Sequence, residues 1–306
     1  MKVLVLSEHD VLELLPMREC IAVMEDALRA LGRGEVHNPL RQAIRAPGAP
    51  GLLGLMPAWR GGDRPVYALK EVCVFPDNPS QRGLDTHLGT VILHSGETGE
   101  PLAILNAAAI TAIRTAAVSA VATKLLARED ATVLAVIGTG AQGEAHVEAI
   151  PHVRTIKEIR VAGRSTELGV EEAVRGADIV VTATSSREPI LRREWLSPGT
   201  HINAVGSSIA SARELDSETM ATVSLFVDRR ESTVNESGDY LHAVKDHPVE
   251  IRAELGELLL GTATGRRTAE EITLFKSLGL AVEDLAAAVY VYDRARERGR
   301  GVEVEL

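Results

Sequence analysis

The sequence predicts an α/β protein with a doubly wound parallel sheet and a second, α+β domain. Three observations support this fold class. An apolar run at 133–137 leads into a glycine-rich turn and then a helical pattern. Beyond residue 143, short apolar runs alternate with helical segments, as in a parallel sheet. Between residues 39 and 105 the runs are separated by proline and glycine, which is typical of an antiparallel sheet.

The N-terminal part predicts two helices followed by a group of strands. Ser7 and Asp10 have the spacing of a capping box that opens a short helix. Pro16 suits the first turn of a second helix over 17–31, whose apolar stripe ends at Gly32. We then expect five strands, at 41–46, 52–59, 66–75, 88–94 and 102–105.

Two further helices are predicted, an alanine-rich one over 107–127 and a closing one over 280–296 that crosses back to the first domain. The apolar stretch 102–127 is long enough to span a membrane, but Arg114 and Lys124 would be costly in lipid. We therefore expect a helix of the protein core and no membrane partner.

The parallel sheet is predicted to continue through strands at 158–162, 178–183, 201–205 and 224–227, with a helix at 170–175. Only 13 residues separate Arg164 from Asp178. A regular mononucleotide-binding fold has a helix, a third strand and a further helix there, and one βαβ unit alone takes roughly 30 residues. Either the edge strand has been lost, or a mobile segment is missing from this sequence.

The turn Gly138-x-Gly140-x-x-Gly143 has the form of a dinucleotide-binding loop. Gly138 permits a sharp turn, Gly140 lets the backbone approach a pyrophosphate, and Gly143 lets the helix pack on the strand. Amide groups of the first helical turn, at Ala141 and Gln142, then face the phosphate. The strand before the turn and the helix after it favour a Rossmann-type nucleotide site over a simple glycine turn.

The residues after the second strand bear on the choice of dinucleotide. An NAD-specific site carries an acidic residue there for the ribose 2′-hydroxyl. Here the residues are Arg164, Ser165 and Thr166, a cation and two hydroxyls that suit a 2′-phosphate. We therefore favour NADP(H) over NAD(H); the alternative is a solvated arginine on a loop.

Two cations in apolar surroundings are candidate site residues. Alternation on 66–75 places Lys70 on a face of small and β-branched residues, where burial would lower its pKa, unless it is an edge lysine in water. Arg114 lies within the alanine-rich helix and needs an anionic partner there, either a substrate carboxylate or a structural ion pair. Arg41 precedes a predicted strand, and its position alone gives little evidence for a functional role.

The composition of the chain argues against several classes of function. The formal net charge of −10 gives no electrostatic footprint for nucleic acid or an anionic membrane. Cys20 and Cys73 are far apart and belong to no Cys/His cluster, so we expect two buried thiols, no disulfide and no metal site. Acidic residues directly after the short N-terminal apolar run argue against a signal peptide, and we expect a cytoplasmic protein.

Four separated motifs together resemble the ornithine cyclodeaminase/mu-crystallin family, and the resemblance covers nearly the whole chain. They lie at 113–120, 138–143, 202–206 and 275–284. The resemblance implies a homodimer whose first domain binds a small amino or imino acid, with a nicotinamide cofactor reacting in the cleft between the domains. On this basis the substrate-binding and dimerisation domain comprises residues 1–115 and 285–306, and the dinucleotide domain comprises 116–284.

The resemblance also assigns residues to roles by motif position. Arg41, Lys70 and Arg114 would hold the substrate carboxylate, and three converging cations suit such a group. Thr86 would line the pocket and Thr115 would meet the cofactor. The assignment is completed by Thr182, Ala183 and Val205 for the cofactor, and by Gly279 and Ser208 for the substrate.

Ser208 separates the chain from the cyclodeaminases of this family. Those enzymes carry an acid/base aspartate two residues after the glycine of the Asn-Ala-Val-Gly motif, and a serine hydroxyl cannot pair with an ammonium as a carboxylate does. Ketimine reductases related to mu-crystallin resemble this chain in having serine there. The leading hypothesis is NAD(P)H-dependent reduction of a 2-imino acid, by a ketimine reductase or amino-acid dehydrogenase, with Lys70 completing the carboxylate clamp or relaying a proton.

Two alternatives stay open at this point. One is ornithine cyclodeamination to proline and ammonia, with NAD⁺ used and regenerated in each turnover. The other is an NADP(H)-dependent binding protein of the mu-crystallin type, with little turnover.

Overall fold

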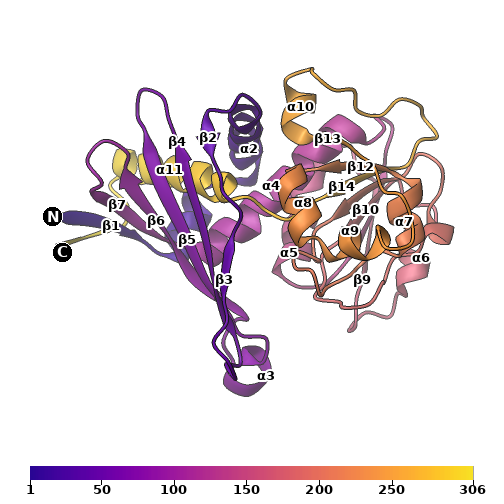
Figure 1. Ribbon diagram of the computed structural model, residues 1–306, viewed down its shortest axis with the longest axis horizontal. Coiled ribbons are helices and arrows are strands. Elements are labelled where there is room, and N and C mark those ends of the chain that lie inside the picture. Colours follow the sequence, from indigo (N-terminus) through magenta and orange to yellow (C-terminus); the bar gives the residue numbers. More distant parts are fainter. Residues whose placement is uncertain (306) are drawn as a thin grey trace. The chain divides into compact units, whose positions relative to one another are not determined.

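The computed structural model describes residues 1–305, which fold as two compact units (Figure 1). Unit 1 contains Met1–Arg114 and the C-terminal segment that begins at Leu280, and unit 2 contains Thr115–Gly279. The first boundary falls inside helix α4 (Ala107–Leu126), between Arg114 and Thr115. These two neighbouring residues, both assigned to the site by resemblance, therefore belong to different units.

Unit 1 is built on an eight-stranded sheet in the order β15-β1-β7-β6-β5-β4-β2, with β3 paired to β4. All pairs are antiparallel except β1 with β7. The strands are β1 (Lys2–Leu6), β2 (Val36–His37), β3 (Gln42–Ile44), β4 (Leu52–Arg60), β5 (Val66–Val74), β6 (His87–Ser95), β7 (Pro101–Asn106) and β15 (Val302–Glu305). The five predicted strands are confirmed as β3 to β7, and β1, β2 and β15 are additional.

Four helices complete unit 1: α1 (Glu8–Leu14), α2 (Met17–Gly32), α3 (Asn78–Arg82) and α11 (Ala281–Arg298). The capping box of α1 is confirmed, because Ser7 accepts from the Asp10 amide while Asp10 accepts from the Ser7 amide. Helix α11 packs against α2 and across β4, β5 and β6. It covers the inner face of the sheet, where Lys70 contacts Asp284 of α11.

The outer face of the same sheet is apolar and only partly buried. Leu69 on β5 lies between Pro57 on β4 and Ile92 on β6, and all three are half-buried. Tyr67, also on this face, is 51% exposed. Cys73 lies on the same face of β5 and is exposed. The expectation of two buried thiols is therefore confirmed for Cys20 and wrong for Cys73.

Unit 2 contains a seven-stranded, wholly parallel sheet in the order β13-β12-β14-β11-β10-β8-β9. The strands are β8 (Val133–Ile137), β9 (Glu158–Ala162), β10 (Ile179–Thr182), β11 (His201–Ala204), β12 (Ser224–Val227), β13 (Ile251–Glu254) and β14 (Thr273–Lys276). The predicted doubly wound sheet is confirmed, and β13 and β14 are additional. Within residues 1–305 the sheet ends at β9, and helix α6 (Val170–Val174) follows the loop after β9 directly.

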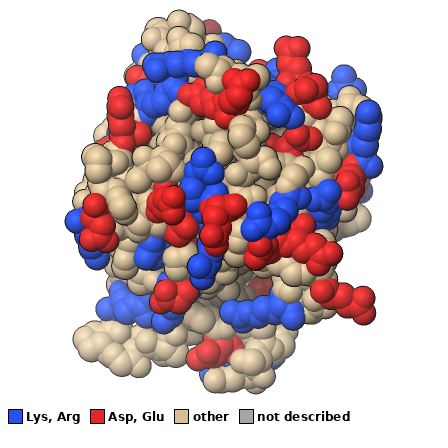
Figure 2. Space-filling view, turned by 90° about the vertical axis from the view of Figure 1, so that its right-hand side faces the viewer, with Lys and Arg blue, Asp and Glu red and all other residues tan. Residues whose placement is uncertain are grey.

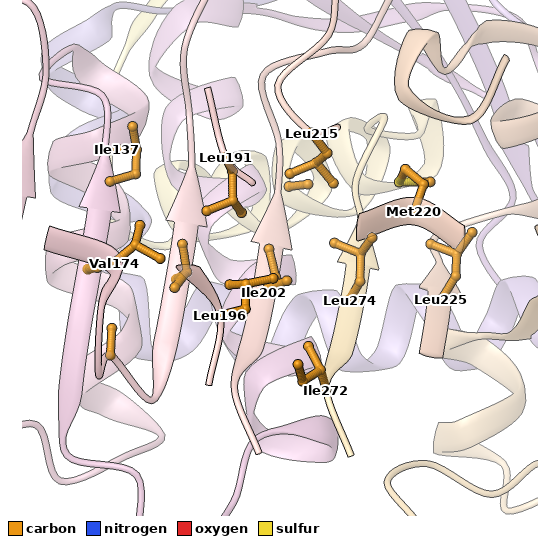
Figure 3. Close-up of a cluster of buried hydrophobic side chains, with 14 of the residues drawn as sticks. Ile137, Val174, Leu191, Leu196, Ile202, Leu215, Met220, Leu225, Ile272 and Leu274 are labelled. Carbon is orange, nitrogen blue, oxygen red and sulfur yellow. The ribbon is translucent and has the colours of Figure 1, made fainter. Parts of the chain in front are cut away.

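The central strands of unit 2 are buried on both faces, as parallel strands inside a sheet require, whereas the edge strand β9 is partly exposed. On β8, Ala135 and Ile137 point into one apolar cluster and Leu134 and Val136 into another. Figure 3 shows the first cluster lying across the strands, where Ile137 is joined by residues of the other strands and the connections. The labelled members are Val174, Leu191, Leu196, Ile202, Leu215, Met220, Leu225, Ile272 and Leu274.

The remaining helices of unit 2 connect and cover these strands. They are α5 (Ala141–Ala149), α7 (Ser217–Thr222), α8 (Arg230–Glu236), α9 (Gly238–Ala243) and α10 (Leu255–Leu259), with 3₁₀ turns at Ile150–His152 and Arg193–Trp195. Helix α4 is long and apolar enough to span a membrane, yet 78% of its most apolar 18 residues is buried inside the protein. On the face that Figure 2 shows, basic and acidic side chains are interspersed.

Candidate functional site

The glycine loop of unit 2 starts where β8 ends. Gly138 has φ +132°, and its amide donates to the Ala162 carbonyl at 2.9 Å. A Cβ atom at Gly138 would lie 2.3 Å from the carbonyl oxygen of Ala183. Glycine is therefore required here both for its backbone conformation and for its close approach to the end of β10.

The other two glycines of the loop have different surroundings. Gly140 is the N-cap of α5, and a Cβ atom there would meet no protein atom within 4 Å. A Cβ atom at Gly143 would lie 2.1 Å from the Gly138 carbonyl oxygen, so glycine allows α5 to pack on the turn. The open position at Gly140, where α5 begins, leaves room for a pyrophosphate to approach the N-terminus of that helix.

The ends of β10 and β11 lie beside this loop. The Ala183 amide donates to Ile137, the last residue of β8, at 2.8 Å, and the Val205 amide donates to Thr182 at 2.9 Å. Ala183 and Val205 are partly exposed. The Thr182 side chain is fully buried and its hydroxyl donates to Glu214 at 2.8 Å. The Thr182 hydroxyl therefore cannot contact a cofactor directly in this structure.

The loop after β9 carries the three residues predicted to choose the dinucleotide. Arg164 and Ser165 are exposed. The Thr166 hydroxyl accepts from the Gly163 amide at 2.8 Å and lies 3.1 Å from the Leu168 carbonyl oxygen. Thr166 thus holds its own turn together, and Arg164 and Ser165 are the residues that remain for a ribose phosphate.

In unit 1, Lys70 and Arg114 share one buried carboxylate. Lys70 Nζ and Arg114 Nε each lie 3.0 Å from Asp284 Oδ1. Arg114 also pairs with Glu283 at 2.7 Å, and Lys70 donates to Thr111 Oγ1 at 2.6 Å. Each of the two cations is 4% exposed. The alternative of an edge lysine is wrong, because β5 is a central strand. Arg114 does form structural ion pairs, and its role toward a substrate carboxylate stays a prediction.

The charges of this cluster act on one another. Burial lowers the pKa of Lys70 to about 8; Asp284 opposes this, while the positive charges of Arg114 and Arg41 add to it. Burial would raise the pKa of Asp284, but Arg114 and Lys70 outweigh that effect, so its pKa lies below the usual value. The cations Lys70, Arg114 and Arg41 and the carboxylates of Glu283 and Asp284 thus influence one another's charge within this cluster.

The other residues assigned by resemblance occupy varied positions. Thr86 is half-buried just before β6, and its carbonyl accepts from the Phe75 amide at 2.8 Å. Thr115 is buried on α4, and Ser208 is half-buried after β11. Gly279 has φ +75°, and its amide donates to Asp228 at 2.9 Å. Arg41, Lys70, Thr86 and Arg114 belong to unit 1, and the remainder belong to unit 2.

Five buried carboxylates had no role in the sequence-based assignment: Asp228, Glu283, Asp284, Glu214 and Asp239, each at most 1% exposed. The signal that could have found them is an acidic residue among apolar or small neighbours, as at 281–288. Across residues 1–305 there is no group of three or more His, Cys, Asp or Glu side chains that could hold a metal ion.

The class of protein follows from the parallel sheet, from the glycine loop after its first strand, and from the similarity to known proteins. It is an oxidoreductase that uses a nicotinamide dinucleotide. The chain belongs to the ornithine cyclodeaminase/mu-crystallin family, whose model matches residues 1–169 and 167–299.

Individual relatives are similar over most of the chain. Mouse ketimine reductase mu-crystallin is 39% identical over 292 residues, covering 89% of this chain and 91% of that protein. The structure of Thermococcus litoralis Δ¹-pyrroline-2-carboxylate reductase in complex with NADH and L-proline has a TM-score of 0.95, 37% identity and coverage of 99% and 100%. An archaeal alanine dehydrogenase dimer with bound NAD has a TM-score of 0.92, 32% identity and full coverage of both chains.

The comparisons also bear on the short segment after β9. The two matches to the family model meet at residues 167–169. The alignment with a Δ¹-pyrroline-2-carboxylate reductase of Bacillus cereus, at 36% identity, covers 99% of this chain and all of that protein over 327 positions, more than the 306 residues here. That relative therefore has residues that this chain lacks, and the junction of the two matches falls in the short segment between β9 and α6.

Proposed function

We propose that the protein reduces a cyclic 2-imino acid to the corresponding amino acid at the expense of a reduced nicotinamide dinucleotide. Hydride adds to the carbon of the C=N bond, one proton adds to nitrogen, and the dinucleotide is oxidised. The observation that carries the proposal is the buried cluster in which Lys70 and Arg114 share Asp284, whose Oδ2 has no hydrogen-bond partner within residues 1–305, with the charge of Arg41 acting on Lys70. A glycine loop indicates a dinucleotide, whereas this cluster indicates a carboxylate substrate.

The residues of the cluster would divide the work. Arg41 and Arg114 bind the substrate carboxylate and so fix the orientation of the ring. Lys70, which donates to Thr111 and Asp284, is placed to hold the proton that the substrate nitrogen takes up. Asp284 Oδ2 has no hydrogen-bond partner within residues 1–305 and can accept from that nitrogen once it is protonated. Hydride would be the contribution of the bound nicotinamide.

The substrate class follows from chemistry shared with the relatives. Reduction of the C=N bond of Δ¹-pyrroline-2-carboxylate gives proline, and the Thermococcus litoralis relative was solved with NADH and L-proline. Ser208 supports a reductase over a cyclodeaminase, since a neutral hydroxyl cannot hold the second ammonium group of ornithine as an aspartate can.

For the cofactor we favour NADP(H). Arg164 and Ser165 are exposed on the loop after β9, and an arginine there suits a 2′-phosphate. The relatives solved with a dinucleotide carry NADH or NAD, so both forms have to be compared.

We also propose a cytoplasmic homodimer formed through the outer face of the unit 1 sheet. The half-buried Pro57, Leu69 and Ile92 and the exposed Tyr67 form an apolar surface there, and such a surface favours burial against a partner. Cys20 and Cys73 are free thiols, which suits a reducing compartment.

The test follows the absorbance of NADPH, and separately of NADH, with cyclic 2-imino acids and with 2-oxo acids plus ammonia or methylamine. An ornithine and NAD⁺ assay for ammonia runs in parallel. We expect imine-dependent oxidation, faster with NADPH. Ammonia and proline from ornithine would establish a cyclodeaminase instead. Tight NADPH binding without oxidation in any of these assays would indicate a binding protein.

A further inference from the structure

Glu214 is a buried carboxylate that joins two segments of unit 2. It is fully buried, and both of its oxygens accept hydrogen bonds. Oε1 accepts from the Thr184 amide at 2.7 Å and from the Thr184 hydroxyl at 2.8 Å. Oε2 accepts from the Gly206 amide at 2.7 Å and from the Thr182 hydroxyl at 2.8 Å. One side chain thus holds the residues that follow β10 to those that follow β11.

These two segments lie at the edge of the sheet where a dinucleotide binds. In parallel sheets the ligand meets the carboxyl ends of the strands. Ala183, between the two threonines, is the residue whose carbonyl oxygen lies against Gly138, and a Cβ atom at Gly138 would come within 2.3 Å of it. A shift of the segment after β10 would therefore displace the first glycine of the dinucleotide loop.

Glu214 is itself held in place by a second buried carboxylate. Asp239 Oδ1 accepts from the Glu214 amide at 2.8 Å and from the Leu215 amide at 3.0 Å. Its Oδ2 accepts from the Ser207 hydroxyl and lies 3.3 Å from Lys276 Nζ. Lys276 also donates to the Ala204 carbonyl, at the end of β11, at 3.1 Å. The network therefore fixes the ends of β10, β11 and β14 as one rigid group.

We propose that Glu214 is a positioning residue for the dinucleotide, setting the segments after β10 and β11 against the glycine loop. The inference rests on the proposed function only in that this loop binds a nicotinamide dinucleotide. A glutamine cannot fully replace the glutamate, because its single amide oxygen can serve the Thr184 amide or the Gly206 amide but not both.

The experiment compares Glu214→Gln with a matched control, Asp178→Asn. Asp178 also binds two backbone amides, those of Thr132 at 2.8 Å and Val133 at 3.0 Å, but at the amino end of β8. We measure Kd for NADPH and NADH by fluorescence, KM for the imino acid at saturating dinucleotide, and Tm. For Glu214→Gln we expect Kd to rise about tenfold, the loss typical when one buried backbone donor is left without its acceptor, with KM for the imino acid unchanged. For Asp178→Asn we expect a lower Tm and a Kd within about twofold of the wild-type value.

The outcomes separate the two proposals. If the wild-type protein binds neither dinucleotide, the proposed function fails. If it does bind and folded Glu214→Gln binds equally well, or if both variants weaken binding to the same degree, the positioning role is wrong. Thr182→Val removes only one donor to Glu214 at nearly constant shape, and it decides the question if Glu214→Gln does not fold. We expect its Kd to rise about threefold, and an unchanged Kd would contradict the proposal.

Discussion

The protonation state of Lys70 should determine how the rate of the reaction depends on pH. Its pKa of about 8 means that the ammonium form is held below that pH and lost above it. If this ammonium holds the proton for the substrate nitrogen, kcat/KM should fall by about tenfold per pH unit above pH 8.

The variant Lys70→Arg tests whether Lys70 causes the fall of kcat/KM above pH 8, because a guanidinium stays charged through this pH range. We expect a slower enzyme, and a ratio of wild-type to variant kcat/KM that falls by about tenfold per pH unit between pH 8 and pH 10. Taking this ratio removes the titration of the imino acid itself, which affects both proteins equally. A ratio that stays constant with pH would show that Lys70 is not the source of the fall.

Arg114 has a structural and a catalytic part to play, and two substitutions separate them. Arg114→Ala leaves Glu283 and Asp284 buried with one cation fewer, and we expect the free energy of unfolding to drop by about 3–5 kcal/mol. Arg114→Lys keeps the charge but not the planar fork. It should fold, with KM for the imino acid raised about tenfold and Kd for the dinucleotide unchanged.

At the scale of elements, the turn from β8 into α5 yields a matched pair of substitutions. Gly140→Ala meets no protein atom within 4 Å, whereas Gly143→Ala places a methyl group 2.1 Å from the Gly138 carbonyl oxygen. We expect Gly140→Ala to retain the wild-type Tm but to weaken dinucleotide binding at least tenfold, because the methyl group occupies ligand space. Gly143→Ala should lose both stability and binding. Unimpaired binding by Gly140→Ala would place the dinucleotide elsewhere.

Helix α5 also makes stability depend on pH. His146 bonds to the Gln142 carbonyl oxygen at 2.6 Å and to Ser119 Oγ at 2.9 Å, and burial lowers its pKa to about 4. The unfolded chain, with a histidine pKa near 6.5, binds more protons between pH 6.5 and pH 4. The free energy of unfolding should therefore fall, by about 2 kcal/mol between pH 7 and pH 5 from this residue alone.

Urea unfolding at the two pH values measures this effect. The difference between pH 7 and pH 5 should shrink in His146→Gln and persist in His9→Gln, a substitution on the exposed face of α1. His201, whose pKa burial lowers to about 3, keeps its own share of the acid sensitivity in both variants. An undiminished difference in His146→Gln would contradict the assignment.

Prediction from sequence succeeded where a local pattern determines the element. The capping box of Ser7, the strand over 158–162 and the three glycines are examples, because turn chemistry and alternation act over a few residues. Strand β14 has no such signal: its four residues pair between β11 and β12, and only the folded sheet specifies those neighbours. Strand β15 is equally short and fully exposed.

The candidate site divides in the same way. Arg114 and Lys70 were recognisable as cations in apolar surroundings. Their partners Glu283 and Asp284 lie 169 to 214 positions away, and no spacing rule connects them. Glu214 is harder still, since its role depends on four donors, which come from the last residue of β10 and from the segments that follow β10 and β11.

At the scale of the whole molecule, the apolar outer face of the unit 1 sheet predicts the oligomeric state. Sedimentation equilibrium should give twice the mass of the chain. Leu69→Glu, at the centre of that face, should give a monomer because a carboxylate would be buried without a partner. Val234→Glu introduces the same charge at an exposed apolar residue of unit 2 and should leave the dimer intact. A wild-type monomer would refute the dimer proposal.

The sheet of unit 2 ends at β9, and this open edge has a consequence for solubility. A strand paired on one side only presents backbone groups to which another chain can add, and Ile159, on this strand, is 43% exposed. Glu158 and Arg160 flank that isoleucine and pair with each other at 2.7 Å. Charged residues on an edge strand discourage addition of a foreign strand. These two charges therefore protect the exposed edge at β9 against the addition of another chain.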